Sequence, residues 1–247
     1  DSAFTFLNRV TGGDPSQIFG SINAANGKIF LINQSGILFA PGSSVNAAGL
    51  TASTLDIANA DFLAGRYTFF GKGGSVVSQG YISAPGGYVA LLGSSVENAG
   101  VIEANLGKVV LASGEKITLG LDAADLISVV IDEETTQNLE GKDAAVNNKG
   151  KITADGGKVI LTAKTLDGVF KKAANNEGVI EARSLVNKNG EVYLLGNMEN
   201  DTVANTGVID VSAEQLGADG GFVEISAAEV LVDGEIDVTA IDGAAGE

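Results

Sequence analysis

The sequence predicts an all-β protein whose chain winds into a parallel β-helix, a solenoid of stacked coils. A short phrase recurs along the 247 residues, its copies begin with glycines at mostly similar intervals, and its apolar residues alternate with period two. Repeats of this length, about 20 to 50 residues, are typical of solenoids, propellers and arrays, and a period of two indicates strands. The leading glycines are Gly80, Gly100, Gly150, Gly178, Gly207 and Gly234.

Residues 98–113, NAGVIEANLGKVVLAS, show what one copy contains. Ile102 and Ala104 share one face of a strand, and Val109 and Leu111 share one face of the next. Gly107 lies between the two strands, where the chain must turn. The same residue types recur at 78–93 and 148–163, and shorter copies follow at 176–182, 189–196, 205–213, 220–227 and 233–240.

One coil cannot bury its apolar face alone, so successive coils stack at about 4.8 Å and share a continuous core. We expect Ile102, Ile152 and Ile180 to form one inward row of that core. Asparagines stand two positions before four of the leading glycines and predict a ladder hydrogen-bonded from coil to coil and to the backbone. They are Asn98, Asn148, Asn176 and Asn205.

Other repeat architectures fit the sequence less well. Helical repeats are disfavoured because the copies are rich in Val, Ile, Thr and Gly. A propeller blade needs about 40 residues and four strands, whereas each copy here contains two or three short strands. The sequence has no run of about 18 apolar residues, so it contains no candidate for a membrane-spanning helix.

We expect one β-helix domain over residues 1–247. Residues 1–70 are expected to form N-terminal, aromatic-rich capping coils, because the segment 1–90 contains eleven of the fourteen aromatic side chains and large side chains suit the end of a solenoid. Residues 148–247 are expected to form regular coils. The copies still run at the C-terminus, so we expect the chain to be truncated from a longer protein.

Residues 114–147 interrupt the repeat and predict an extra-helical β-hairpin insertion on one flank of the solenoid. LISVVIDE, 126–133, is typical of a strand, and ETTQNLEGKDAA, 134–145, of a polar turn or short helix. The spacing of the acids here matches neither an EF-hand nor a calcium-binding nonapeptide, so we interpret them as solvated charge rather than as a metal site. They are Asp122, Asp125, Asp132, Glu133 and Glu134.

Composition excludes several functions. The formal net charge is −16, which disfavours nucleic acid as a partner because such binding depends on neutralising phosphates. The chain has no cysteine and no histidine. It therefore lacks the residues of thiol nucleophiles, of Ser-His-Asp triads and of common zinc sites. We expect no cofactor and no metal.

Three motifs between positions 8 and 69 point to a known family. They are NRVTGGDPSQIFGSI at 8–22, GKIFLINQSGILF at 27–39 and GLTASTLDIANADFLAGRYTF at 49–69. With these motifs the chain resembles the secretion domain of the filamentous haemagglutinin family, which are large exoproteins exported by two-partner secretion in Gram-negative bacteria. LASGEKITL and LISVVIDE in the insertion resemble the same family, so the resemblance covers most of the chain.

The resemblance implies a right-handed parallel β-helix that addresses an exoprotein to an outer-membrane barrel transporter. Periplasmic domains of the transporter would capture the chain unfolded, after which it would fold at the bacterial cell surface and act as a folding nucleus. The implied protein is secreted, has no catalytic activity in this domain and is adhesin-like. We expect a monomer.

The resemblance also implies six recognition or fold-determining residues. The NRVT motif of the family maps onto Asn8, Arg9, Val10 and Thr11. The family's Asn-Pro-Asn-Gly motif maps onto residues 33–36. Gln34 and Ser35 replace its second and third residues, so only Asn33 and Gly36 carry over.

Alternatives remain open at this point. Asn8, Asn33 and Asn46 fit buried turn asparagines that satisfy backbone groups, and Arg9 fits a local salt bridge. A polysaccharide-active β-helix enzyme would need convergent carboxylates, and the repeat acids stand at similar phases without a cluster of basic residues. These acids are Glu103, Glu181, Asp210 and Asp237. A third function is direct adhesion to glycans of host cells or biofilms.

Overall fold

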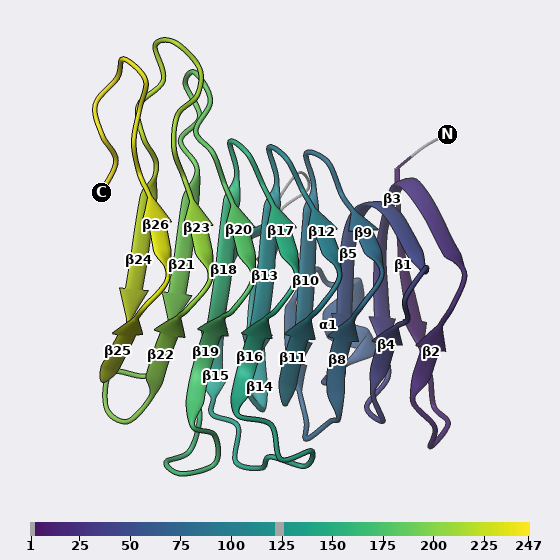
Figure 1. Ribbon diagram of the computed structural model, residues 1–247. Coiled ribbons are helices and arrows are strands. Elements are labelled where there is room, and N and C mark those ends of the chain that lie inside the picture. Colours follow the sequence, from purple (N-terminus) through teal and green to yellow (C-terminus); the bar gives the residue numbers. More distant parts are fainter. Residues whose placement is uncertain (1–2, 122–125) are drawn as a thin grey trace.

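The computed structural model describes residues 3–121 and 126–247. The chain forms a parallel β-helix in which each coil contributes strands to three rows (Figure 1). All strand pairs within these rows are parallel, which confirms the parallel β-helix that the sequence predicted. No helix among the described residues is long and apolar enough to span a membrane.

The first row is a separate eight-stranded sheet. It contains β2 (Ser16–Ile18), β4 (Ile37–Phe39), β8 (Ser75–Ser78), β11 (Ser95–Asn98), β16 (Ala144–Asn148), β19 (Lys172–Asn176), β22 (Thr202–Asn205) and β25 (Glu229–Val232).

The second and third rows form one fourteen-stranded sheet because two long strands, β3 (Ser21–Ile32) and β5 (Ser44–Ser53), belong to both. The second row continues with β9 (Tyr81–Ser83), β12 (Val101–Glu103), β17 (Lys151–Thr153), β20 (Val179–Glu181), β23 (Val208–Asp210) and β26 (Glu235–Asp237). The third row contains β1 (Phe4–Arg9), β10 (Tyr88–Gly93), β13 (Lys108–Ser113), β18 (Lys158–Ala163), β21 (Glu191–Leu195) and β24 (Phe222–Ser226).

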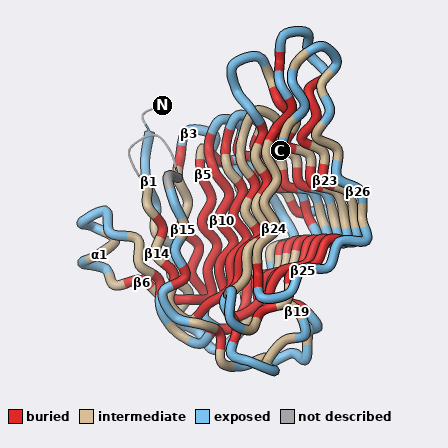
Figure 2. The backbone as a smooth tube through the Cα atoms, turned by 90° about the vertical axis from the view of Figure 1, so that its left-hand side faces the viewer, coloured by how far each residue is buried: buried red, intermediate tan, exposed pale blue. Residues whose placement is uncertain are grey.

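The predicted inward row of isoleucines is confirmed. Ile102 lies opposite Ile152, and Ile152 lies opposite Ile180. All three side chains are fully buried in one apolar cluster. Figure 2 shows that buried residues recur from coil to coil along the solenoid. The row extends from Ile82 to Ile236, so each coil offers its neighbour a matching apolar face.

The asparagine ladder is also confirmed. The Nδ2 of Asn98 donates to Oδ1 of Asn148 at 2.8 Å, and Asn148 donates to Asn176 at 2.8 Å. Asn176 donates in turn to Asn205 at 2.7 Å. All four side chains are fully buried, and each Nδ2 also faces a backbone carbonyl at 3.3 to 3.4 Å.

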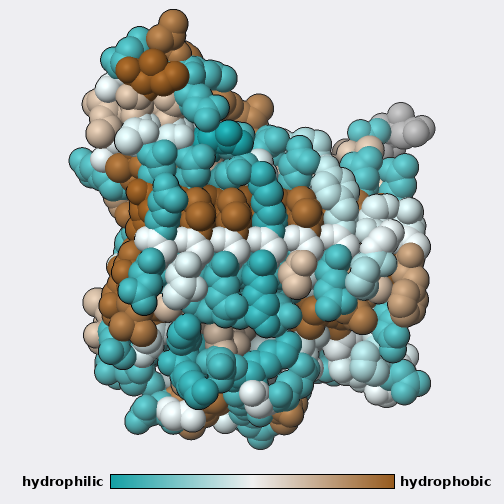
Figure 3. Space-filling model, viewed as in Figure 1, coloured by the Kyte–Doolittle hydropathy of each residue, from teal (hydrophilic) through white to brown (hydrophobic). Residues whose placement is uncertain are grey.

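The leading glycines stack beside this ladder and form a corner between the first and second rows. A β carbon on Gly150 would overlap the carbonyl oxygen of Gly100, and one on Gly178 would overlap that of Gly150. The same carbonyl of Gly150 accepts the N–H of Val179 at 2.9 Å. We call this row the glycine corner. It lies along the pale band across the middle of Figure 3.

Two excursions leave the solenoid after the third row and pair with one another. The first contains β6 (Asp56–Ile57), α1 (Asn59–Leu63) and β7 (Tyr67–Phe70), and the second is the hairpin of β14 (Lys116–Leu121) and β15 (Leu126–Glu133). Together the strands form a four-stranded sheet in which β7 pairs antiparallel with β14. The predicted extra-helical hairpin is therefore confirmed, but residues 144–147 of the predicted insertion 114–147 belong to β16 in the first row. Residues 56–70, expected among the capping coils, belong instead to this sheet.

The four-stranded sheet covers the outer face of the third row and encloses a second apolar core. Tyr88, Ala90 and Leu92 point outward from β10 into this core, while Val89 and Leu91 point into the solenoid. Aromatic rings fill much of the space: Phe30 lies 5.2 Å from Tyr67 and 6.4 Å from Phe69 between ring centroids. Many of the N-terminal aromatics therefore pack in this core, whereas Phe4, Phe6 and Phe19 are exposed.

The polar segment 134–143 forms turns, with an isolated bridge between Thr135 and Thr165. The expectation of a polar turn over 134–145 is confirmed up to residue 143, whereas Ala144 and Ala145 begin β16, and the alternative of a short helix is wrong. The carboxylate of Glu115 accepts the backbone N–H of Thr136 at 2.9 Å and so fixes the start of this segment.

Candidate functional site

The NRVT motif lies at the end of β1, on the first coil. Asn8 lies opposite Leu31 of β3, Arg9 lies opposite Ile32, and the N–H of Val10 donates to the carbonyl of Ile32 at 2.8 Å. The side chains of Asn8 and Thr11 are exposed, whereas Arg9 and Val10 are half-buried. The motif therefore presents two polar side chains, Asn8 and Thr11, to solvent, while its arginine points toward the first excursion.

Arg9 joins the first coil to the extra-helical sheet. Its Nε lies 2.7 Å from Oδ1 of Asp56, and Nη1 donates to Oδ1 of Asn59 at 2.6 Å. Its Nη2 donates to the carbonyl of Ile57. Hydrogen bonds to charged groups contribute about 1.5–3 kcal/mol each when well shielded. Since Arg9 and Asp56 side chains are only 25% and 32% exposed, this contact is shielded more than an ordinary surface pair.

Asn33 ties the second motif to the first. Its Nδ2 donates to the carbonyl of Asp14 at 3.0 Å and lies 2.9 Å from Oγ of Ser16. Its Oδ1 accepts the N–H of Ser35 at 2.9 Å, which is the contact of an Asx turn. The side chain is 1% exposed. A single buried amide therefore fixes its own turn and the turn of the preceding coil.

Gly36 closes the same turn. Its N–H donates to the carbonyl of Asn33 at 3.1 Å, and its φ of 133° is one that residues with a side chain rarely adopt. Gln34 is exposed and Ser35 is half-buried. This geometry accounts for the departure from the family motif: the two positions with strict requirements keep Asn and Gly, and the two between them vary.

The structure brings the three N-terminal motifs together, and we call this region the motif junction. It comprises Arg9, Asn33 and Gly36 with the partners Asp56 and Asn59. Sequence reasoning missed Asp56 and Asn59, although both lie in the third motif. Their separation of 47 and 50 residues from Arg9 hides the contact in the sequence.

The sequence also allowed purely structural roles for Asn8, Asn33, Asn46 and Arg9, and the structure assigns such a role to two of them. Asn33 is a buried turn asparagine as expected, and Arg9 forms the expected local salt bridge. The same expectation is wrong for Asn8 and Asn46, whose side chains are exposed. Asn46 Nδ2 lies 3.4 Å from Oδ1 of Asn23 on the neighbouring coil, which is a surface contact.

Metal-binding side chains do not gather in the part of the chain that the structure describes. No group of three or more Asp and Glu side chains there is arranged to hold an ion. Asp122 and Asp125 of the predicted acidic cluster lie outside the described residues. Asp132 and Glu133 are exposed, and Glu133 lies 3.8 Å from Lys116.

The repeat acids line up on the outer face of the second row. Glu181 lies opposite Asp210, and Asp210 lies opposite Asp237. Glu103 lies further along the same face, opposite Thr153.

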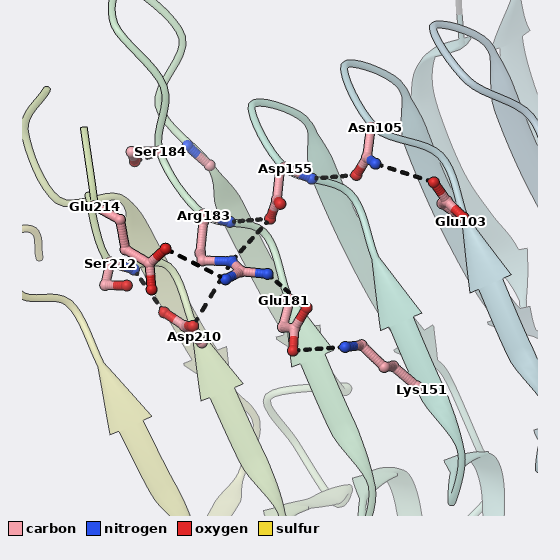
Figure 4. A network of polar contacts seen from close by, with 11 residues as sticks. Glu103, Asn105, Lys151, Asp155, Glu181, Arg183, Ser184, Asp210, Ser212 and Glu214 are labelled. Atoms are coloured by element: carbon pink, nitrogen blue, oxygen red, sulfur yellow. Dashed lines mark hydrogen bonds and ion pairs between the residues drawn. The ribbon is translucent and has the colours of Figure 1, made fainter.

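The sequence shows no cluster of basic residues beside these acids, but the structure brings two single basic residues, Arg183 and Lys151, to them (Figure 4). The guanidinium of Arg183 lies 2.9 Å from Glu181, 3.4 Å from Asp155, 3.6 Å from Glu214 and 3.9 Å from Asp210. Lys151 Nζ lies 2.8 Å from Glu181. Partial burial acts to lower the pKa of Arg183, but the surrounding carboxylates raise it, so the guanidinium stays charged.

The fold and the motif junction define a β-helical secretion domain. The chain matches the TPS secretion domain family over residues 2–211 and belongs to that family. It is therefore a domain that directs an exoprotein to an outer-membrane transporter in two-partner secretion, and such exoproteins are secreted across the outer membrane. The resemblance to filamentous haemagglutinin-type secretion domains is confirmed.

Curated relatives and solved structures agree with this assignment. The chain is 38% identical over 204 residues to a heme/hemopexin-binding protein of Haemophilus influenzae, covering 78% of the chain and 21% of that protein. A second heme/hemopexin-binding protein of Haemophilus influenzae is 33% identical over 237 residues, 86% of the chain and 24% of that protein. The chain thus spans about a fifth to a quarter of the length of these relatives.

Among solved structures, the HMW1 secretion domain of Haemophilus influenzae superposes with a TM-score of 0.76 at 28% identity, over 97% of this chain and 65% of that one. The filamentous hemagglutinin secretion domain superposes with a TM-score of 0.54 at 15% identity, over 95% and 75% of the two chains, and supports the fold.

Proposed function

We propose that the motif junction is the part of this secretion domain that decides export. In this proposal, periplasmic domains of the transporter capture the chain before it folds, and Asn8, Arg9, Val10, Thr11, Asn33 and Gly36 serve recognition, folding of the first coils, or both. The supporting observation is that Arg9 and Asn33 link the first two coils and the extra-helical sheet. Asn8 and Thr11 are exposed beside them and are available to a partner.

In this proposal, folding outside the cell favours movement of the chain in the outward direction. Each coil that emerges meets a finished edge with a matching row of isoleucines and asparagines, and burying one such aliphatic side chain contributes about 1.5–3 kcal/mol before entropy is subtracted. Residues 1–247 act as one unit that folds as a monomer at the cell surface and serves as nucleus for the coils that follow in a longer exoprotein.

Secretion assays with paired substitutions test the proposal. The chain is expressed with its transporter, and the amount exported is compared with the urea stability of each purified variant. Arg9→Gln and Asp56→Asn both break the ion pair between Arg9 and Asp56, but only the first removes the side chain that a transporter would contact. We expect both to reduce export, and a larger loss for Arg9→Gln identifies direct recognition.

Arg66→Gln is the matched control. Arg66 also pairs with an aspartate, Asp61, at 2.6 Å, but its side chain is 64% exposed and the pair lies within one short segment. This variant should be exported normally. Normal export of Arg9→Gln would refute the proposal.

We propose that the domain has no enzymatic activity. A polysaccharide-active site needs carboxylates free to act as acids, bases or metal ligands. Arg183 and Lys151 engage two of the aligned carboxylates, Glu181 and Asp210, while Tyr81 donates to Glu103 and Thr239 donates to Asp237. Incubation with acidic polysaccharides and calcium should give no product. A reducing-end or unsaturated-sugar signal would overturn this conclusion.

The names of the relatives suggest a role for the complete protein. We propose that the whole exoprotein binds haem or hemopexin, or adheres to glycans, through parts beyond this domain. The domain contains no histidine or cysteine, which are among the common axial ligands of haem iron. Adding haemin to the purified domain should leave its absorption spectrum unchanged, and a shifted Soret band would place haem binding within it.

A further inference from the structure

The turn at residues 71–75, with the sequence GKGGS, is stacked on the second motif. The N–H of Gly74 donates to the carbonyl of Gln34 at 2.8 Å. A β carbon on Gly74 would stand 2.8 Å from the carbonyl oxygen of Ser35, which is closer than β carbons come to other atoms. Glycine is therefore required at this position, because the backbone of the 71–75 turn packs directly on the backbone of the motif turn.

The 71–75 turn also contacts the third motif. A β carbon on Gly73 would stand 2.0 Å from the carbonyl oxygen of Thr54. The hydroxyl of Thr54 donates to the carbonyl of Gly74 at 2.8 Å. The turn is thus a surface on which the second motif and part of the third motif rest.

Glu115 holds the first end of the 71–75 turn. Its backbone carbonyl accepts the N–H of Gly71 at 2.9 Å, and its Oε2 lies 3.2 Å from Nζ of Lys72. Its Oε1 accepts the N–H of Thr136 at 2.9 Å, while Nζ of Lys72 donates to Oγ1 of Thr136 at 3.0 Å. The side chain of Glu115 is only 11% exposed, so solvent screens these contacts less than those of a surface pair.

Glu140 holds the other end of the turn. Its Oε1 accepts the hydroxyl of Ser75, and its Oε2 lies 3.2 Å from Nζ of Lys142. Oγ of Ser75 also lies 2.9 Å from Oγ of Ser95 on the next coil. A serine hydroxyl has one proton. Since Ser75 donates its proton to Glu140, Ser95 donates to Ser75, and the carboxylate orders both serines.

Both carboxylates come from the part of the chain that interrupts the repeat. Glu115 immediately precedes β14, and Glu140 lies in the polar turns of 134–143 that lead into β16. The 71–75 turn leads into β8, and the two segments meet at the lower corner of the solenoid in Figure 1. Residues far downstream of the second motif therefore contact the turn that carries it.

We propose that Glu115 and Glu140 are positioning residues for the second motif. They fix the 71–75 turn at its two ends, and the turn fixes the backbone of residues 33–36 through the contacts of Gly74. The motif turn is then held in full only after the chain has emerged as far as residue 140. The consequence for export rests on the proposed function of the motif junction, whereas the positioning itself does not.

Hydrogen exchange in the purified full chain tests the positioning. The reporters are the N–H groups of Ser35, Gly36 and Gly74, which donate to the motif residues Asn33 and Gln34.

Glu115→Ala and Glu140→Ala should each lower the protection of these amides about three- to tenfold. The loss should be larger for Glu115→Ala, since the two side chains are 11% and 47% exposed. Wild-type protection in both variants would overturn the proposal, and wild-type protection in one would remove that residue from it.

Glu191→Ala is the matched control. The carboxylate of Glu191 also pairs with a lysine, Lys158, and accepts a hydrogen bond from Tyr193 at 2.8 Å, but it lies on β21. This variant should leave the three reporter amides unchanged. An equal loss of protection in the control would contradict the proposal, because global stability would then govern exchange at the motif.

A conservative variant separates positioning from a general loss of packing. Glu140→Gln keeps an oxygen that accepts the Ser75 hydroxyl, so it should retain most of the protection that Glu140→Ala loses. Combining Ser75→Ala with Glu140→Ala should lower protection by less than the product of the two single effects, because both remove the same contact. Independent effects would show that Glu140 does not act through Ser75.

Export of the same variants distinguishes this proposal from the proposed function. Reduced export of Glu140→Ala together with normal export of Glu140→Gln supports both. Weakened protection with normal export supports the positioning and contradicts the motif junction as the part that decides export.

Discussion

The glycine corner has no room for a side chain. At Gly150 and Gly178 the coils approach so closely that a methyl group would strike the carbonyl of the preceding glycine. That carbonyl accepts the N–H that begins the second-row strand of the next coil. A side chain at this place would therefore displace a backbone hydrogen bond as well as a neighbouring atom.

Gly178→Ala should destabilise the protein by about 2–4 kcal/mol because two coils must separate locally to admit the methyl group. Urea unfolding measures the change. Gly12→Ala is the control, since no atom lies within 4 Å of its β-carbon position. Equal stability of the two variants would contradict the steric role of the glycine corner.

Asn148 occupies the middle of the buried ladder, where it accepts from Asn98 and donates to Asn176. Asn148→Ala leaves both neighbours with an unsatisfied polar atom and should cost about 2–4 kcal/mol. Asn23→Ala, at an exposed position with one long contact of 3.4 Å, should cost far less. Differential scanning calorimetry of the two variants provides the comparison, and a similar melting temperature for both would argue against the ladder as a stabilising element.

Among the elements, the four-stranded extra-helical sheet depends on residues from two distant segments. Phe69 of β7 lies opposite Ile117 of β14 and points into the second core, whereas the adjacent Phe70 is 47% exposed. Both excursions pack apolar side chains into the same second core, against the outer face of the third row. The sheet and the outer face of the third row therefore form one cooperative unit.

Phe69→Ala should cost about 3–5 kcal/mol because it removes a fully buried ring that stacks on Phe30. Phe70→Ala, at the next position on the opposite face, should change the free energy of unfolding little. Guanidinium unfolding of both variants decides the point. A comparable loss from Phe70→Ala would mean that the sheet does not cover the solenoid as described.

Glu115 gives this unit a dependence on pH. Burial acts to raise the pKa of Glu115, but hydrogen bonds from Thr136 and the ion pair with Lys72 outweigh burial and lower it. A carboxyl whose folded pKa is lowered stabilises the native state above its unfolded pKa of about 4.3 and loses that contribution as the pH falls through the folded value. Glu115→Gln should therefore flatten the acid side of the stability profile.

Urea midpoints between about pH 6 and pH 3 test this dependence. Glu133→Gln is the control, because its carboxylate is 63% exposed and lies 3.8 Å from Lys116. The control should keep the wild-type slope. An unchanged slope in Glu115→Gln would show that other carboxylates govern acid unfolding.

Across the whole molecule, charge is unevenly distributed. Every lysine and arginine lies in the segment 1–190, where the two signs nearly balance, whereas the segment 191–247 is acidic throughout. Like charges stacked from coil to coil repel, and salt screens that repulsion over a Debye length of about 10 Å at 0.1 M. Arg183 contacts acids on two successive coils, Glu181 on its own and Asp210 on the next.

Hydrogen exchange at low and high salt should report this asymmetry. Amides of β22, β23 and β24 should gain protection as salt rises, because screening stabilises the acidic coils. Amides of β8, β9 and β11 lie in the charge-balanced part and should change little. Equal salt dependence in the two groups would contradict an electrostatic origin.

The repeated phrase predicted the solenoid because each coil must match its neighbours, so the rows through Ile102 and Asn148 are visible as spacing in the sequence. The site was predicted less completely. Arg9 and Asn33 were found through motif resemblance, but the contact of Arg9 with Asp56 depends on an excursion whose packing no local pattern reveals. The pairing of β7 with β14 was missed for the same reason, since strand alternation does not identify a partner that lies far along the chain.

The corner between the first and second rows and the corner between the second and third rows accommodate insertions to different extents. An insertion at the glycine corner would part adjacent coils, whereas the opposite corner already accommodates both tight turns and much longer loops. Longer loops at that second corner can therefore change what the exported molecule presents to its surroundings without parting the coils.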